Sequence, residues 1–310
     1  MTLPQVAFQA LLLLLGLAGR VLGHMTLPEV AFGALLVLAL TASWYKYSIS
    51  TGTVAKVLEL YLWLTPILSF LVLAPIHDRA GLKGLVPIAV LHLAMVAWAL
   101  RTVYPASHGS VSARLGGVLL IFGAAFVWPG AVSFVGMDLQ GIAAHREDHL
   151  FTVGGFLVGS LVSLAGFTAL RAQLRESGDV LFSQLGLLAL VIGTMCWILH
   201  LAFRATVMLV AAQESAATAP TWYQALRLWA GAMYAAYMVL AYLSIAFFGA
   251  AMQKTRWAGK GWGRTFVAFG LISAATFVAR VGGDFPLMVQ FMPYAMGMIL
   301  LRRASVATAH

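Results

Sequence analysis

Long apolar runs, separated by short polar connections, make up most of this 310-residue chain. Nine runs after Leu27 approach the roughly 20 residues with which a helix crosses the hydrocarbon core of a bilayer. They fall at residues 28–45, 54–75, 85–103, 114–137, 150–171, 181–211, 222–252, 265–281 and 286–301. Backbone polar groups in hydrocarbon must be paired internally, and the alternating segments of a β-barrel are absent. The pattern therefore predicts an all-α fold, a polytopic bundle with nine core transmembrane helices.

The N-terminal region contains a repeat, because MTLPQVAF at residues 1–8 returns as MTLPEVAF at residues 25–32. Residues 1–24 are therefore set apart from a single transmembrane domain at residues 25–310. They are interpreted as an extra helix that arose by tandem duplication. Three other origins stay open: an upstream start codon, a signal sequence, and a cloning remnant, since His24-Met25 is what a common cloning site leaves.

Composition places the chain in a membrane, since 62% of the residues are hydrophobic, 9% are charged and the mean hydropathy is +0.92. The net charge of +9 does not indicate nucleic acid binding, because the basic residues are spread singly between apolar runs. Membrane lipids are the expected partners, together with other membrane subunits. The single cysteine, Cys196, excludes a disulfide within the chain.

Alternate connections differ in their content of Lys and Arg. The richer set holds Lys46, Lys56, Arg101, Arg114, Arg171, Arg175, Lys254, Arg256, Lys260, Arg264, Arg302 and Arg303. The other set holds Arg20, Arg79, Lys83, Arg146 and Arg280. Connections rich in Lys and Arg stay in the cytoplasm. The count predicts a multi-pass protein of the bacterial inner (plasma) membrane with a cytoplasmic C-terminus.

One apolar run, CWILHLAFRATVMLV, carries His200 and Arg204 one helical turn apart and therefore on one face. A charged group within a span costs about 2.5–3.5 kcal/mol on insertion scales, so this face should point into the bundle or a cavity. Arg227 follows in the next helix, and Arg280 and Asp284 are expected near the same level. Together with Arg280 and Asp284, Arg204 and Arg227 predict a substrate-binding site for an anion on the outward side. Two alternatives stay open: the arginines pair with a carboxylate of the chain or a lipid phosphate, or Arg227 extends toward the outer headgroups.

Two histidines within apolar runs, His92 and His200, both occur in the tetrapeptide LHLA. Histidines on different spans can ligate a haem b axially, as in membrane cytochromes. His92 and His200 are therefore candidate cofactor-binding residues. The alternative interpretation is a pair of neutral, hydrogen-bonded core histidines.

The connections IHDRAGLKG and GIAAHREDH, both predicted outside, bring His77, His145 and His149 to one surface. His145 and His149 have the spacing with which two imidazoles on one helix face bind zinc or copper. These three histidines are the candidate metal ligands. A polar turn whose charges are only solvated is the alternative.

No sequence motif indicates catalysis, since the Walker A loop, HExxH, GxSxG and the Rossmann glycine pattern are absent. The function expected first is that of a non-catalytic multi-pass protein, an accessory or structural subunit of a membrane complex. Two alternatives follow from the candidate sites: a small-molecule or ion transporter with an outward-side arginine pocket, and a haem b or quinone redox protein. A stripe of small residues, Gly155, Gly159 and Ser163, predicts close helix packing without a ligand.

Overall fold

The computed structural model describes residues 52–105, 110–134, 138–214, 218–279 and 288–306. These residues form helices and short connections, with no strand among them, so the all-α prediction is confirmed for this part of the chain. The chain divides into two units, one ending at Ser107 and one beginning at His108. The predicted first span at 28–45 and the N-terminal repeat lie outside the described residues.

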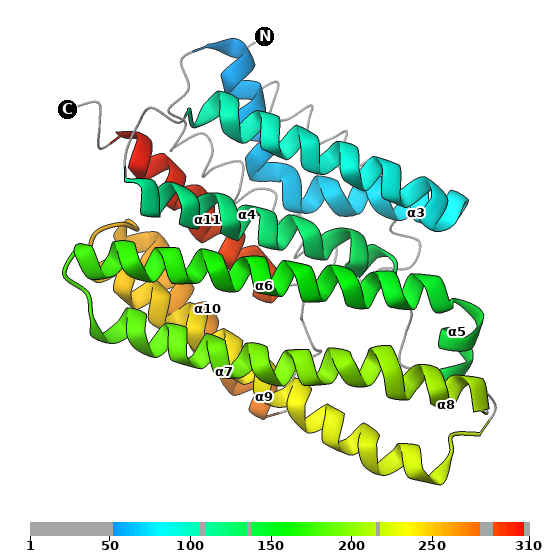
Figure 1. Ribbon diagram of the computed structural model, residues 1–310. Coiled ribbons are helices and arrows are strands. Elements are labelled where there is room, and N and C mark those ends of the chain that lie inside the picture. The colour runs from blue at the N-terminus through cyan, green and yellow to red at the C-terminus, as the bar shows by residue number, and fades with distance from the viewer. Residues whose placement is uncertain (1–51, 106–109, 135–137, 215–217, 280–287, 307–310) are drawn as a thin grey trace. The chain divides into compact units, whose positions relative to one another are not determined.

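The described part of the first unit is α3 (Thr53–Val103), which breaks at Gly81 and folds into two arms (Figure 1). Gly81 has φ 57° and ψ −153°, a conformation open to glycine because it lacks a Cβ atom. His92 in the second arm contacts Tyr61 and Ser69 in the first, so the arms lie side by side. The arms correspond to the predicted spans at 54–75 and 85–103.

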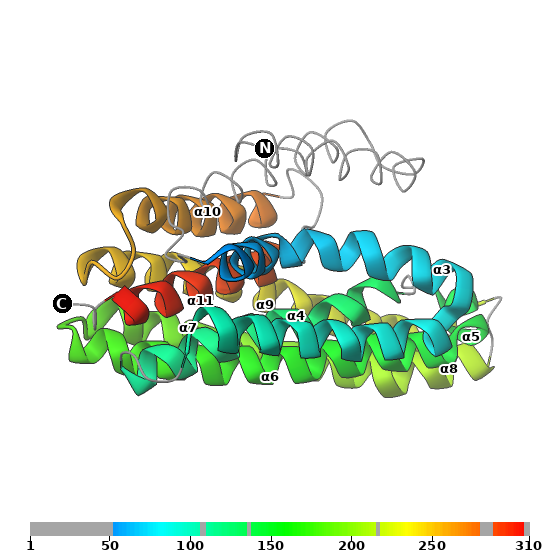
Figure 2. The ribbon, with the colours of Figure 1, turned by 90° about the horizontal axis from the view of Figure 1, so that it is seen from above.

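The second unit is a helical bundle. It comprises α4 (Val111–Val132), α5 (Leu139–Ala144), α6 (Arg146–Glu176), α7 (Leu181–Phe203), the π-helical turn η2 (Arg204–Met208), α8 (Leu209–Glu214), α9 (Thr221–Lys254), α10 (Lys260–Val278) and α11 (Met288–Val306). Helices α7, η2 and α8 follow one another without a break. Helix α4 packs between α6 and α11, and α7 packs between α6 and α9. Figure 2 shows α10 beside α9.

Glycines allow the backbones of α4 and α6 to approach closely. A Cβ atom on Gly123 of α4 would lie 2.2 Å from Ser163 Oγ and 3.0 Å from the carbonyl oxygen of Gly159. A Cβ atom on Gly155 would lie 3.2 Å from the carbonyl oxygen of Phe126. The predicted packing role of the small-residue stripe on α6 is therefore confirmed, and such stripes are a common way for membrane helices to associate.

Six helical segments in the described part of the chain are long and apolar enough to cross a membrane. They are Val72–Val103, Val111–Val132, Arg146–Glu176, Leu181–Glu214, Thr221–Lys254 and Lys260–Val278. The predicted count of nine core spans is not confirmed. The described part of the last predicted span, at 286–301, belongs to helix α11, which begins at Met288, but Gln290, Arg302 and Arg303 reduce the apolar character of this helix.

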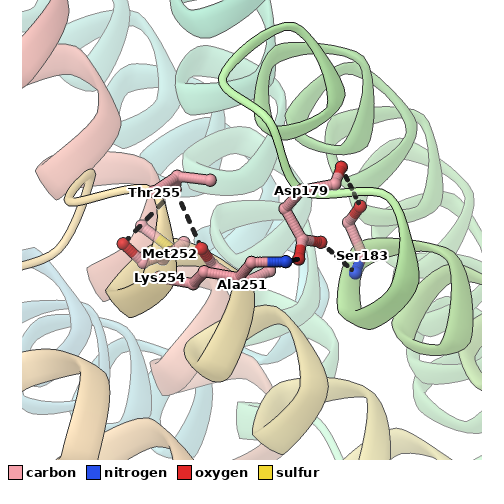
Figure 3. A network of polar contacts seen from close by, with 6 residues as sticks. All are labelled: Asp179, Ser183, Ala251, Met252, Lys254 and Thr255. Atoms are coloured by element: carbon pink, nitrogen blue, oxygen red, sulfur yellow. Dashed lines mark hydrogen bonds and ion pairs between the residues drawn. The ribbon is translucent and has the colours of Figure 1, made fainter.

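A buried carboxylate ties the turn between α6 and α7 to the end of α9 (Figure 3). Asp179 is fully buried; its Oδ2 accepts from the backbone N–H of Ser183 at 2.8 Å, and its Oδ1 lies 3.2 Å from Lys254 Nζ. One side chain thus satisfies an N–H group of the first turn of α7 and pairs with the last turn of α9. Sequence reasoning did not single out Asp179, because its partner lies 75 residues away.

Candidate functional site

Helices α6, α7 and α9 each contribute to an aromatic layer inside the second unit. Trp197 of α7 stacks on Tyr237 of α9, with ring centroids 4.6 Å apart, and on His200, with centroids 5.3 Å apart. Phe156 of α6 and Tyr234 of α9 complete the layer at 5.8 Å and 6.1 Å from the Trp197 ring. Such contacts between rings favour one fixed arrangement of the three helices.

The orientation of His200 is fixed by one hydrogen bond. Its Nδ1 lies 3.0 Å from the carbonyl oxygen of Ala230. A carbonyl oxygen can only accept, so Nδ1 carries the proton and, in the neutral ring, Nε2 carries the lone pair. His200 therefore presents an acceptor with its second nitrogen.

A basic layer lies seven residues along each helix from the aromatic one and contains His149, Arg204 and Arg227. Seven residues are close to two helical turns, so they bring these side chains to the same faces about 10 Å away. Arg204 is 3% exposed, and its guanidinium carbon lies 4.9 Å from the centre of the Phe134 ring. A cation over an aromatic face is stabilised by the ring quadrupole, which lowers the cost of burying Arg204.

His149 holds Arg204 at two points. Its Nε2–H donates to the backbone carbonyl oxygen of Arg204 at 2.9 Å, which leaves the lone pair on Nδ1. Nη2 of Arg204 lies 3.5 Å from that Nδ1 and donates toward it. The contact falls where α7 changes into the π-helical turn η2 at Arg204. Single π turns within α-helices are frequent at functional sites.

A cavity of about 520 Å³ joins the two layers. Residues of α4, α6, α7, α9 and α11 line it, and most of the lining is aromatic or aliphatic. Arg227 and Gly231 on α9 are exposed, whereas Arg204, His200 and Gln290 are buried. The cavity is therefore exposed on its α9 side and buried on the sides that η2, α7 and α11 supply. Its size and its few polar groups are typical of small-molecule sites.

Three of the predicted site residues, His200, Arg204 and Arg227, come together at this cavity. The other two members of the predicted anion site, Arg280 and Asp284, lie outside the described residues. The assignment of these residues to a substrate site stays a prediction.

Among the cavity residues that sequence reasoning missed are a hydroxyl and an amide side chain, Ser160 and Gln290. Ser160 follows Gly159 of the small-residue stripe, and Gln290 is a single amide in an apolar run. For both Ser160 and Gln290, the only sign in the sequence of a place at a cavity was an isolated polar side chain within an apolar run.

His92 has a complete set of hydrogen bonds within the first unit. Ser69 Oγ donates to the carbonyl oxygen of Thr65 at 2.7 Å, so it accepts from His92 Nε2–H at 2.8 Å. Nδ1 of His92 is then the acceptor for the Tyr61 hydroxyl at 3.0 Å. The hydrogen bonds run from the Tyr61 hydroxyl through His92 and Ser69 to the carbonyl oxygen of Thr65. They fit a structural role for His92, which joins the two arms of α3. Haem b ligation by His92 and His200 stays a prediction.

The candidate metal ligands occupy different environments. His149 is fully buried on Arg204, whereas His145 is exposed at the break between α5 and α6 and lies 3.6 Å from Asp148. His77 belongs to the first unit. No group of three His, Cys, Asp or Glu residues that could hold a metal ion occurs within the described ranges. Metal binding by these histidines also stays a prediction.

Comparisons with protein-family models, with curated proteins and with solved structures found no match to this chain. The class of protein is therefore defined by the chain itself: its apolar helices are those of a multi-pass membrane protein. Its described part contains an aromatic cavity with two arginines at one end.

Proposed function

We propose that this multi-pass membrane protein binds and transports a small organic anion. The observation that carries the proposal is that Arg204 and Arg227, from consecutive spans, line one cavity whose other walls are largely apolar. Guanidinium groups bind carboxylates through charge-assisted, often bidentate hydrogen bonds. An aromatic lining takes up the apolar part of such a ligand.

Arg227 and Arg204 have different roles in this proposal. Arg227 is exposed and sits less than two turns from the start of α9, so it meets an entering anion first. Arg204 is buried and held by His149 and Phe134. Its fixed charge keeps the basic end of the cavity positive without rearrangement of the side chain. A polar intramembrane residue that faces a cavity is the usual mark of a substrate pathway.

The other functions predicted from the sequence receive less support. An accessory or structural subunit of a membrane complex and a haem b or quinone redox protein stay predictions. The cavity favours the transporter hypothesis, because it has room for a small molecule and is lined by the positive charges of Arg204 and Arg227.

Substitution of Arg227 tests the proposal. We expect wild-type protein in detergent to bind phenylpropanoate, and Arg227→Gln to bind it about tenfold more weakly, since a hydrogen bond to a charged group contributes about 1.5–3 kcal/mol. Isothermal titration calorimetry gives the dissociation constants. Arg175→Gln is the matched control, because Arg175 is also exposed and lies at the far end of α6. Equal losses of affinity in Arg227→Gln and Arg175→Gln would contradict the proposal.

A transport assay completes the test. Proteoliposomes that contain wild-type protein should accumulate radiolabelled phenylpropanoate, and those with Arg227→Gln should accumulate less at the same substrate concentration. Binding without accumulation would restrict the protein to a receptor or an accessory role.

A further inference from the structure

The buried end of the cavity carries polar atoms that lack hydrogen-bond partners among the described residues. They are the indole Nε1–H of Trp197, the hydroxyl of Ser160 and the amide Oε1 of Gln290. The three side chains are 8%, 7% and 7% exposed. Buried polar groups in native structures are nearly always hydrogen bonded. Three unpaired groups on one cavity therefore indicate that something polar binds between them.

These groups come from three different helices, α6, α7 and α11, and converge on the aromatic layer. The basic layer lies about 10 Å away, since seven residues at 1.5 Å per residue separate Trp197 from Arg204 and Tyr234 from Arg227. A ligand that reached both ends would need an anionic group at one end and a polar group at the other. An apolar body of about one ring would lie between them.

We infer that the ligand is an aromatic carboxylate with a hydroxyl group at the opposite end of the ring. The inference rests on the proposed function and specifies its substrate class. A carboxylate only accepts hydrogen bonds and so belongs with the guanidinium groups of the basic layer. A hydroxyl group both donates and accepts. It can therefore donate to Gln290 Oε1 or His200 Nε2 and accept from Trp197 Nε1–H.

Other end groups fit the buried end less well. An ammonium group only donates, so it would leave the Trp197 N–H without an acceptor. A second carboxylate only accepts, and it would face the Gln290 oxygen and the lone pair of His200. A methyl group would leave all three polar atoms unpaired. The hydroxyl is the simplest group that accepts from the Trp197 N–H and donates to one of the two acceptors at the same time.

A pair of ligands that differ only in this hydroxyl tests the inference. We expect para-hydroxyphenylpropanoate to bind wild-type protein at least tenfold more tightly than phenylpropanoate, as measured by isothermal titration calorimetry. Sites built to hydrogen-bond a substrate hydroxyl discriminate strongly against the analogue without it. Gln290→Leu should abolish the difference between the ligands, and Ser160→Ala provides a second, smaller change at the same end. Arg227→Gln should weaken both ligands by the same factor.

The outcomes separate the two proposals. Equal affinity of the two ligands for wild type, with Arg227→Gln still weakening both, would overturn the hydroxyl inference and leave the anion site standing. Binding of neither ligand would overturn the proposed function. A hydroxyl preference that survives in both Gln290→Leu and Ser160→Ala would also overturn the inference, because the hydroxyl would then bind elsewhere.

Discussion

At the scale of single residues, the two histidines four positions apart illustrate how environment decides role. His149 is buried against Arg204 and uses both ring nitrogens on that residue. His145 is exposed, and its contact is with Asp148 in the next turn. Their spacing alone predicts one shared metal ion, whereas their surroundings give them separate contacts.

The contrast between them leads to a stability prediction. His149→Leu should lower the free energy of unfolding by about 1–3 kcal/mol, because it removes hydrogen bonds to the buried carbonyl and guanidinium groups of Arg204. His145→Leu should change it by less than about 0.5 kcal/mol, as is usual for exposed positions. Thermal melts in one detergent measure both. Comparable losses of zinc affinity in the two variants would instead support the metal-site hypothesis.

At the scale of elements, the seam between α4 and α6 depends on the absence of side chains. A Cβ atom on Gly123 would lie 2.7 Å from the backbone nitrogen of Ser163, and a backbone atom cannot rotate away. On α6, the partner helix, a Cβ atom on Gly154 would meet nothing within 4 Å. The two glycines therefore provide a matched pair.

Alanine at these positions should act in opposite directions. Gly123→Ala should destabilise the protein by about 1–3 kcal/mol through overpacking. Gly154→Ala should be neutral or stabilise it by up to about 1 kcal/mol, since Ala is the better helix former. Melting midpoints in detergent test the pair. A stable Gly123→Ala variant would mean that the helices do not pack at this distance.

The junction of α6, α7 and α9 at Asp179 gives a second element-scale prediction. Asp179→Asn keeps an acceptor for the Ser183 N–H but loses the ion pair with Lys254, whose side chain is 52% exposed. The expected cost is below about 1 kcal/mol, because solvent screens a half-exposed pair. Asp179→Ala should cost about 1 kcal/mol more, since it also removes the acceptor for the Ser183 N–H in the first turn of α7.

Glu176→Ala provides the control for this series, because Glu176 is an exposed acid at the end of α6. Urea or thermal unfolding should rank the proteins as wild type and Glu176→Ala first, then Asp179→Asn, then Asp179→Ala. If the Asp179→Ala protein is as stable as the Asp179→Asn protein, the hydrogen bond from the Ser183 N–H does not contribute to the free energy of unfolding.

At the scale of the whole molecule, the prediction concerns orientation in the membrane. The positive-inside count puts the turn after α9 in the cytoplasm and the connection before it outside. Gly259 in that turn is exposed, whereas Ala258 is buried, so Gly259 is the position chosen for labelling. In a Cys196→Ser background, Thr218→Cys should react with an impermeant maleimide in intact cells, and Gly259→Cys only after lysis. The reverse pattern would invert the assignment.

The sequence by itself determined the helical, membrane-spanning character of the chain. Backbone hydrogen bonds within hydrocarbon must be local, so a run of about 20 apolar residues has one stable conformation. It also predicted the packing stripe on α6, because small residues spaced by four lie on one helix face. Arg204 stood out in the same way, since a charge within an apolar run is costly unless it faces protein or a cavity.

Only the tertiary structure decided which faces meet. A helix that is apolar on every side has no single apolar stripe that would mark its buried face. The periodicity of apolar residues therefore does not show which face of such a helix points into the bundle. The pairs His149 with Arg204 and Asp179 with Lys254 lie 55 and 75 residues apart. The inclusion of Gln290 in the cavity likewise depends on how α11 packs. Such contacts follow from the rotation and register of packed helices, which are properties of the assembled bundle.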